Sequence, residues 1–406
     1  MEDFKRWMTA ESGASLPKMQ IGKMMRNREM GQYRKQPSRQ EPFISNKWSN
    51  FTPSRKANLA NRFFPNRDET TRVTSVALLR CFHLPNERLF TLSQDNILRF
   101  HMRQKSQRYR LLNSYNAPSR YRIITDITRS TKGDHLAYTT LDSYLYYFHV
   151  NRINEPMRWN LFHLVQPNAF SWNICSNVSF NMEDNYLFVV ESGGQLGVIR
   201  IDIPRHHRFS FNAHRKDILA VGSSKCNPGI FYTAASDGLW KVWDNRSSRN
   251  VYPVQLSFTP SYNIAHIDSD SQDKYIVTTS CCGTRIDVWD LRFPANEPFE
   301  NYQQQNVREA ISILSSGHIS IKTGRRRDEE EFFLRAKFSP QITGHRYIYV
   351  TSSIGYLYIF DIVTGEVRSF HQQGTLIYNS SWHPDNSEIS CVTLSGAIIT
   401  YYHREE

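Results

Sequence analysis

The feature that most restricts how this chain can fold is a repeated ending of short strand pairs. Seven times, an apolar stretch is followed by a turn and by a second apolar stretch that ends in Asp or His. The endings are ILRFH, LYYFH, GVIRID, WKVWD, IDVWD, LYIFD and ITYYH, and their last residues stand at positions 101, 149, 202, 244, 290, 361 and 403. Successive endings are therefore 48, 53, 42, 46, 71 and 42 residues apart. Repetition at such a period indicates an array of similar structural units.

The pattern inside each unit predicts the architecture. Stretches such as DNYLFVVESGGQLGVIRID and HRYIYVTSSIGYLYIFD show an apolar strand, a tight turn containing Gly and another apolar strand. Continuous apolar strands at a period of about 40–45 residues are typical of four-stranded blades that pack face to face in a WD-repeat propeller. We therefore predict an all-β fold, a seven-bladed WD-repeat β-propeller over residues 61–406.

Two segments need a separate interpretation. The chain ends in YYHREE directly after the third strand of the seventh unit, so that blade needs an outer strand from elsewhere. Residues 62–73, RFFPNRDETTRV, are the best candidate for this closing strand, because closure removes the exposed edges of the ring. The spacing of 71 contains residues 293–331, which we predict to be a solvated polar insertion between blades five and six.

Residues 1–60 differ from the rest of the chain. They hold 12 Lys or Arg against 5 Asp or Glu, and so contribute +7 of the formal charge of +12. They also hold six of the nine methionines and show little strand pattern. We predict a basic, largely disordered N-terminal arm that suits an acidic partner. A short amphipathic helix around PKMQIGKMMRNREM that folds on a partner is the alternative.

Several classes of protein are disfavoured by what the sequence contains. There is no run of about 18 apolar residues, so we expect no membrane partner and place the protein in nucleus and cytoplasm. The six cysteines form no Cys-x-x-Cys pair and are expected to be reduced core thiols. His206 and His207 have no second ligand pair at zinc spacing, and phosphate-binding loops are absent. We therefore expect no metal, no cofactor and no catalytic residues.

Two consecutive units place an arginine two residues beyond a Trp-Asp pair, in SDGLWKVWDNR (236–246) and TRIDVWDLR (284–292). Trp243 and Trp289 are expected to pack between blades, and Asp244 and Asp290 to stabilise the turn that follows. The blade's internal hydrogen-bond network is expected to involve the residues His214, Asp237 and either Thr233 or Ser236.

Arg246 and Arg292 have no such structural explanation. Both follow the end of a third strand, so their side chains should project side by side from one rim of the propeller. A guanidinium held on a rigid strand end is well suited to bind a carboxylate or a carbonyl on another protein. The pair therefore predicts a docking surface.

These stretches carry a resemblance to a known family. FYTAASDGLWKVWDNR (231–246) and VTTSCCGTRIDVWDLR (277–292) resemble the box by which WD-repeat substrate receptors of cullin-4 ubiquitin ligases dock on the damaged-DNA-binding adaptor. The first copy departs from the box at Tyr232, Trp240 and Asn245, and the second at Thr278 and Gly283. Similarity to the family extends over roughly residues 55–406 and includes ANRFFPN, RKDILAV, RAKFSPQITGHRYIYV and SSWHPDNSEI.

The resemblance implies a non-catalytic substrate receptor that presents proteins for ubiquitination and proteasomal degradation, with a bZIP stress transcription factor as one substrate of relatives. Adaptor contacts would come from Trp243, Asp244, Arg246, Trp289, Asp290 and Arg292, and cullin-4 would be reached through the adaptor. The opposite rim and the central channel would receive the substrate. For an acidic degron, the candidates near the starts of inner strands are Arg122, Arg215, Lys216 and Arg335.

A different class of function stays open. The basic arm, with aromatics such as Tyr33 and Trp48, also fits a non-catalytic scaffold that binds RNA or a ribonucleoprotein. We expect a nucleic-acid partner only under this alternative, because the remaining 346 residues carry only +5.

Overall fold

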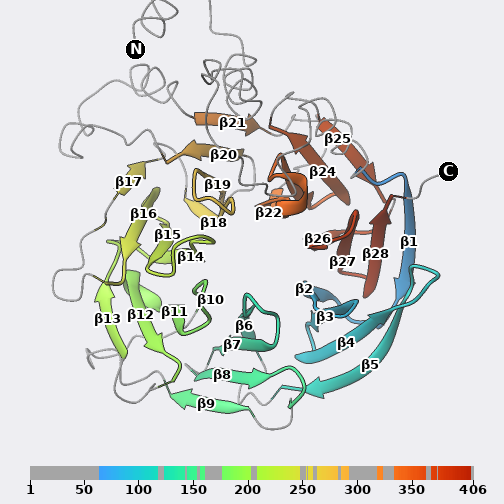
Figure 1. Cartoon of the computed structure of the whole chain (residues 1–406), viewed down its shortest axis with the longest axis horizontal. Helices are drawn as coiled ribbons and strands as arrows, with labels where there is room; N and C mark the ends of the chain where they lie inside the picture. Colours follow the sequence, from blue (N-terminus) through green and yellow to red (C-terminus); the bar gives the residue numbers. More distant parts are fainter. Residues whose placement is uncertain are drawn as a thin grey trace, which may run out of the picture.

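The repeated units fold into seven four-stranded antiparallel sheets arranged as a ring (Figure 1). The predicted seven-bladed propeller is confirmed. This computed structural model describes residues 64–117, 123–141, 144–152, 156–160, 176–202, 208–246, 253, 255–258, 263–281, 285–291, 318–322, 333–362, 367–372 and 374–403. The N-terminal arm predicted over residues 1–60 lies outside these ranges.

Each blade runs from an inner strand outward. Blade one consists of β2 (Leu78–Leu84), β3 (Arg88–Ser93), β4 (Ile97–Arg103) and β5 (Tyr109–Asn116). Blade two consists of β6 (Ile124–Arg129), β7 (His135–Thr140), β8 (Tyr144–His149) and β9 (Met157–Asn160). Blade three consists of β10 (Asn177–Phe180), β11 (Tyr186–Val190), β12 (Gln195–Arg200) and β13 (Arg208–Asn212), with the short 3-10 helix η1 (Ser192–Gly194) between its middle strands. Blade four consists of β14 (Ile218–Ser223), β15 (Ile230–Ala235), β16 (Leu239–Asp244) and β17 (Gln255–Phe258).

The remaining blades follow the same order. Blade five consists of β18 (Ile264–Ser269), β19 (Tyr275–Ser280), β20 (Arg285–Asp290) and β21 (His318–Lys322). Blade six consists of β22 (Phe333–Phe338), β23 (Tyr347–Ser352), β24 (Tyr356–Asp361) and β25 (Val367–His371), with the 3-10 helix η3 (Gln341–Thr343) after its inner strand. Blade seven consists of β26 (Ile377–Trp382), β27 (Glu388–Thr393), β28 (Ala397–Tyr402) and, from the other end of the chain, β1 (Arg67–Arg72).

The ring is closed by β1, which pairs antiparallel with β28 from Arg67 opposite Tyr402 to Arg72 opposite Ala397. In Figure 1 the blue β1 lies beside the dark red strands of the C-terminus. This strand falls inside residues 62–73, the segment expected to close the ring. Closure of this kind joins two segments more than 300 positions apart and leaves the seventh blade with four strands.

The segment 293–331 contains more than a loop. Residues 318–322 form β21, which pairs with β20 from His318 opposite Trp289 to Lys322 opposite Arg285. The sequence HISIK alternates polar and apolar residues, a pattern that fits an outer strand. This part of the predicted insertion therefore belongs to blade five, and the rest of residues 293–331 lies outside the described ranges.

Burial follows the position of a strand in its blade. All six residues are buried in each of β19, β23 and β27, which are second strands. By contrast, most residues of the outer strands β5 and β25 are exposed. Second strands face a neighbouring blade on each side, which explains why their sequences are continuously apolar rather than alternating.

The core is divided among the interfaces between blades. In the described residues, seven apolar clusters lie one at each interface, from blades one and two around to blades seven and one. Each cluster joins residues of two successive blades, for example Phe90 and Leu98 of blade one with Tyr138 and Phe148 of blade two. No helix among the described residues has the length and apolarity to cross a membrane.

The cysteine prediction is correct for two described residues and wrong for two. Cys81 and Cys391 are buried in strands, whereas Cys226 and Cys281 are exposed. The exposed pair lies just beyond the ends of β14 and β19, where the chain has left the sheet. Cys175 and Cys282 lie outside the described ranges.

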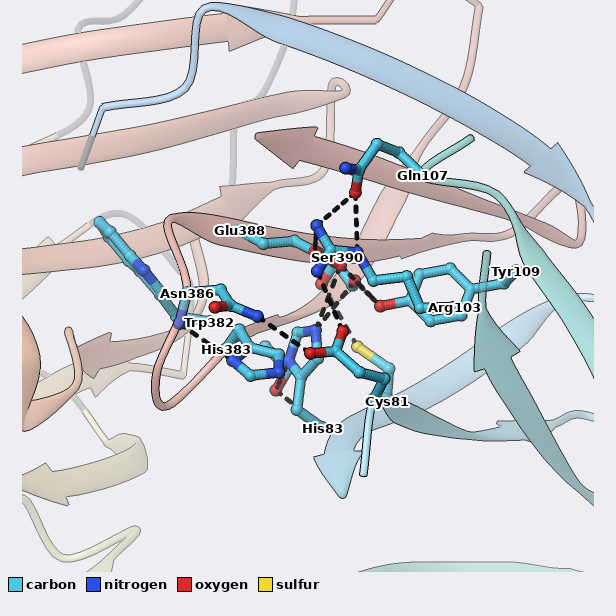
Figure 2. Close-up of polar contacts among 12 residues, drawn as sticks. Cys81, His83, Arg103, Gln107, Tyr109, Trp382, His383, Asn386, Glu388 and Ser390 are labelled. Atoms are coloured by element: carbon cyan, nitrogen blue, oxygen red, sulfur yellow. Dashed lines mark hydrogen bonds and ion pairs between the residues drawn. The ribbon is translucent and has the colours of Figure 1, made fainter. Parts of the chain in front are cut away.

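A buried polar network holds blade seven to blade one, where the two ends of the chain meet (Figure 2). Glu388 on β27 is paired with Arg103 at 2.6 Å and accepts a hydrogen bond from the Tyr109 hydroxyl at 2.6 Å. His83 lies 3.8 Å from the same carboxylate and 3.1 Å from the Ser390 hydroxyl. These contacts and the ion pairs hold the pKa of Glu388 below its usual value, although burial opposes that shift. The network pairs the buried charge of Glu388 with a cation and connects blade seven with blade one.

The two rims of the ring are distinct. Within a blade the first and third strands run in the same direction, so both begin at one rim and both end at the other. We call these the start rim and the end rim. In blade four the start rim carries the turns before β14 and before β16, and the end rim carries Ser224 and the turn Asn245–Arg246.

Candidate protein-docking site

The Trp-Asp pair of blade four is fixed by a chain of hydrogen bonds. The Trp243 indole nitrogen donates to the Thr233 hydroxyl at 2.8 Å, and Thr233 lies 2.7 Å from His214 Nε2. His214 Nδ1 lies 3.1 Å from Asp237 Oδ2, and Asp237 also accepts the backbone N–H of Leu239. The predicted internal network is thus confirmed, and Thr233 rather than Ser236 supplies the hydroxyl. It ties β16 to β15 and to the turn before β14.

Blade five repeats part of this arrangement in a shifted register. Trp289 donates to the Thr278 hydroxyl at 2.9 Å, as Trp243 does to Thr233. Asp290 pairs with Tyr275 and Asp244 with Ile230, so Thr278 occupies the position of Thr233. The connection between β19 and β20 is one residue longer than that between β15 and β16. The interpretation of Thr278 as a departure from an apolar position is therefore wrong, because an ungapped comparison of the two stretches misplaces this strand.

Both tryptophans pack between blades, as predicted. Trp243 belongs to the cluster that joins blades three and four, and its ring lies 5.0 Å from that of Phe211. Trp289 belongs to the cluster of blades four and five, where its ring meets Trp240 edge to face at 5.6 Å. Trp240, a departure from the family's box, therefore fills the interface beneath the second Trp-Asp pair.

The end rim of blade four presents a clamped arginine. Asp244 accepts the backbone N–H of Arg246 at 3.0 Å, which stabilises the turn after β16. Its two carboxylate oxygens also accept Arg246 Nε at 2.9 Å and Nη2 at 2.7 Å. These hydrogen bonds lower the pKa of Asp244. The Arg246 side chain is nevertheless 65% exposed. It is therefore fixed by Asp244 and still accessible to a partner.

A glycine from the neighbouring turn fits closely behind this arginine. A Cβ added to Gly229 would lie 2.9 Å from Arg246 Nε and 3.2 Å from Asp244 Oδ1. The carbonyl of Gly229 accepts the backbone N–H of Asn245 at 2.8 Å. The clamp therefore depends on three parts of blade four, namely the strand end, the Asp carboxylate and this glycine turn.

The second box is described as far as Leu291. Trp289 and Asp290 lie at the end of β20, in the same place as Trp243 and Asp244 in β16. Arg292 lies outside the described ranges. Blades four and five are neighbours in the ring (Figure 1), so the described parts of both boxes end at the same rim.

The predicted substrate-rim residues separate into two groups. Arg215 and Lys216 are exposed on the start rim, in the turn before β14. Arg335 lies on the inner strand β22, where its Nη2 is 3.4 Å from Asp126 Oδ1 of β6. The contacts of the described residues connect neither Arg215 nor Lys216 with Arg335, and Arg122 lies outside the described ranges.

Residues that sequence reasoning missed surround Arg335. Arg80 of β2 binds Asp126 as well, with Nε and Nη2 both 3.2 Å from Oδ1. Lys337 and His266 belong to the same group, because Arg80, Arg335 and Lys337 all act on the pKa of His266. Arg80, Asp126, His266 and Arg335 are each the third residue of an inner strand, so an alignment of inner strands could have found them.

The described residues offer no group of three or more His, Cys, Asp and Glu side chains arranged to hold a metal ion. The most nucleophile-like arrangement is Ser390, His83 and Glu388 at the seam between blades seven and one. All three are buried in the interior of the ring, where they serve the packing of the seam.

Comparison with known proteins finds relatives whose names match the family that the sequence resembles. The chain is 26% identical over 383 residues to a DDB1- and CUL4-associated factor 11 homolog of Caenorhabditis elegans, covering 87% of this chain and 66% of the relative. It is 27% identical over 294 residues to a protein of the same name from Caenorhabditis briggsae, covering 67% of this chain and 52% of the relative. These likenesses confirm the predicted resemblance.

Two further facts bound the comparison. The chain spans between about half and two thirds of the length of these two relatives. A LEC14B protein of Lithospermum erythrorhizon is also 26% identical over 206 residues, 48% of this chain and 43% of that protein. No protein-family model matches the chain.

Proposed function

We propose that the protein is a non-catalytic substrate receptor of a cullin-4 ubiquitin ligase. In this role it docks on the damaged-DNA-binding adaptor, DDB1, through the end rim of blades four and five. It presents other proteins for ubiquitination and degradation, in nucleus and cytoplasm. The relatives whose names include DDB1 and CUL4 support this proposal, since they match most of this chain.

The observation that carries the proposal is the clamped Arg246. The fold has no use for an arginine here, because the turn is already stabilised by the backbone hydrogen bond to Asp244. Asp244 nevertheless holds the guanidinium in one orientation while 65% of the side chain stays exposed. Such preorganisation lowers the entropy that a long side chain loses when it binds a partner.

The test is a binding isotherm between purified DDB1 and the full chain, with wild type and with the double variant Arg246→Ala, Arg292→Ala. Removal of interface hot-spot residues reduces affinity by roughly tenfold or more per site, so the double variant should bind very weakly. Arg88→Ala is the matched control, because Arg88 begins β3 on the same rim but three blades away. It should bind like wild type.

Two results would contradict the proposal. One is wild-type protein that does not bind DDB1 at all. The other is a double variant that keeps wild-type affinity while its melting temperature is unchanged. A bZIP transcription factor as substrate is a narrower proposal, tested by its turnover in cells that contain or lack the protein.

A further inference from the structure

A group of cations meets on the inner side of the ring. Arg335 of blade six reaches Asp126 of blade two, although blades seven and one lie between these two along the ring. Two blades that are not neighbours can make such a contact only across the inside of the ring. Arg80 of blade one binds the same carboxylate oxygen, Asp126 Oδ1. We call Arg80, Arg335 and Lys337 the inner basic cluster.

Positive charge exceeds negative charge in this cluster. Lys337 Nζ donates to the neutral groups Ser380 O at 2.6 Å and Asn379 Oδ1 at 3.4 Å. The nearby carboxylate of Asp268 is paired with Lys225 at 2.8 Å. Asp126 is thus the one described carboxylate that binds the cluster directly, against three cations. One oxygen of it serves both arginines.

The excess charge has a measurable physical consequence. Burial, together with the charges of neighbouring cations, lowers the pKa of Lys337 to about 8 and that of Arg335 to about 10. Burial and all three cations hold the pKa of His266 well below its usual value, so its ring is neutral. The Nδ1 atom of His266 is buried with no hydrogen-bond partner among the described residues. The folded protein therefore keeps cations close together at an energetic cost.

The backbone at Arg335 is also unusual. Its φ is 51°, the left-handed region that residues with a Cβ seldom adopt, and it lies at an irregularity in the pairing of β22 with β23. The other described non-glycine residues with positive φ lie outside the inner strands. Strain of this kind is concentrated at functional sites, because surrounding structure must enforce it. The residue with this strained backbone is also the one whose guanidinium reaches Asp126.

We propose that the inner basic cluster binds carboxylate side chains of an acidic peptide segment that enters from the start rim. As a substrate site, this inference rests on the proposed receptor function. The side chains of Arg80 and Arg335 are 10% and 28% exposed, so the cluster can be reached by a single extended segment but is recessed from a flat or double-stranded ligand. The described contacts of Arg335 use one of its five N–H donors, and the Tyr378 ring beside Arg80 offers an apolar surface for a neighbouring residue.

The positions of the two arginines in their strands favour entry of the acidic segment from the start rim. Arg80 and Arg335 are third in their strands and Lys337 is fifth, so the two arginines lie nearest the rim where inner strands begin. Arg246 lies on the end rim. A substrate segment and the adaptor would therefore occupy opposite faces of one propeller without competing.

The experiment measures fluorescence anisotropy of a short labelled peptide of alternating Glu and Ser, titrated with the full chain at about 150 mM salt, where surface attraction is largely screened. A peptide with Gln in place of Glu is the neutral control. Arg335→Gly removes the charge and also the strain of the left-handed backbone, so it should melt no lower than wild type. Lys337→Met is the second variant, and Arg246→Met removes the same charge from the opposite rim.

The expected result is binding of the Glu peptide alone, weakened about tenfold or more by Arg335→Gly and by Lys337→Met and unchanged by Arg246→Met. The proposal is overturned if neither peptide binds, if Arg246→Met weakens binding equally, or if single-stranded DNA or inorganic phosphate displaces the peptide at lower concentration than the unlabelled peptide does. Because DDB1 is absent, failure here leaves adaptor docking untouched. Failure of docking would likewise leave the peptide result standing.

Discussion

Replacement of Thr233 by Val tests whether the hydrogen-bond chain of blade four stabilises the propeller as its geometry indicates. Burial lowers the pKa of His214, so its ring is neutral near pH 7 and carries one N–H. Asp237 can only accept, which assigns that N–H to Nδ1 and leaves Nε2 as the acceptor of the Thr233 hydroxyl. Thr233 in turn accepts the Trp243 N–H. One hydroxyl thus satisfies two buried groups.

The magnitude follows from those two groups. Val is close in shape to Thr, and the site is fully buried, so the substitution leaves the Trp243 N–H and His214 Nε2 without partners and creates no large cavity. An unsatisfied buried polar group costs about 1–3 kcal/mol, so the two groups together should make Thr233→Val lower the free energy of unfolding by about 2–6 kcal/mol. For a domain of this size the melting temperature should fall by roughly 3–8 °C.

The assay is thermal unfolding at pH 7.5, followed by circular dichroism and by tryptophan fluorescence. Thr233→Ser keeps the hydroxyl and loses only a methyl group, so it should cost about 1 kcal/mol. Thr278→Val in blade five removes the partner of the Trp289 N–H and should fall between the two. Equal losses for Thr233→Val and Thr233→Ser would refute the reasoning, because stability would then depend on the methyl group and not on the hydroxyl.

Three further predictions follow from single sites. Glu388→Gln should lower the free energy of unfolding at pH 7 by about 2 kcal/mol, because Arg103 loses its buried charged partner and keeps only the exposed Glu87. Since the pKa of Glu388 is lowered in the fold, its contribution to stability is present above its unfolded pKa of 4.5 and disappears as pH falls through the folded pKa. Urea titrations would contradict this prediction if wild type and Glu388→Gln differed in the free energy of unfolding by the same amount at every pH. Burial raises the pKa of Glu191 to about 7, so the stabilising contribution of this residue is present below pH 4.5 and is lost as pH rises through 7. Glu191→Gln should therefore have a higher melting temperature than wild type at pH 8 but not at pH 5. A difference in melting temperature that does not change with pH would disprove the assignment. Gly229→Ala changes no charge, but the added Cβ should displace the Arg246 guanidinium and so weaken DDB1 binding. If the turn shifts and the variant still binds DDB1 with wild-type affinity, the orientation of Arg246 by Asp244 does not matter for docking.

The repeat period and the apolar strands were sufficient to predict the blades. A propeller blade is a local unit of three or four consecutive strands, so its strand order follows directly from its sequence. The closing strand was also accessible, since a seventh blade with three strands must acquire a fourth. Strand β21 was missed because a short strand inside a long polar segment resembles its surroundings, and only pairing with β20 distinguishes it.

The sequence predicted the docking residue on the end rim better than it predicted the inner basic cluster. The Trp-Asp-x-Arg boxes place Arg246 on the end rim through local sequence alone, and its clamp by Asp244 is an interaction across two residues. The inner basic cluster depends on blades one, two and six. An alignment of inner strands places Arg80, Asp126 and Arg335 at the same third position, but only the closed ring shows that the two arginines meet at Asp126. Arg335 was proposed for its charge and its place near a strand start, whereas its partners needed the three-dimensional ring.

In blade four, packing and docking are assigned to residues only a few positions apart, Trp243 in the interior and Arg246 on the end rim. Trp243 is locked inward by Thr233, so the strand end beyond it has little freedom. Asp244, at that end, transfers this rigidity to the guanidinium of Arg246 through contacts to both carboxylate oxygens. An arginine on a loose loop would lose several rotatable bonds of freedom on binding, whereas this one is already ordered by the core of the blade. The same rigid β16 links the interior of the propeller to its rim, and this explains why an exposed arginine and a buried tryptophan occur together in one short motif.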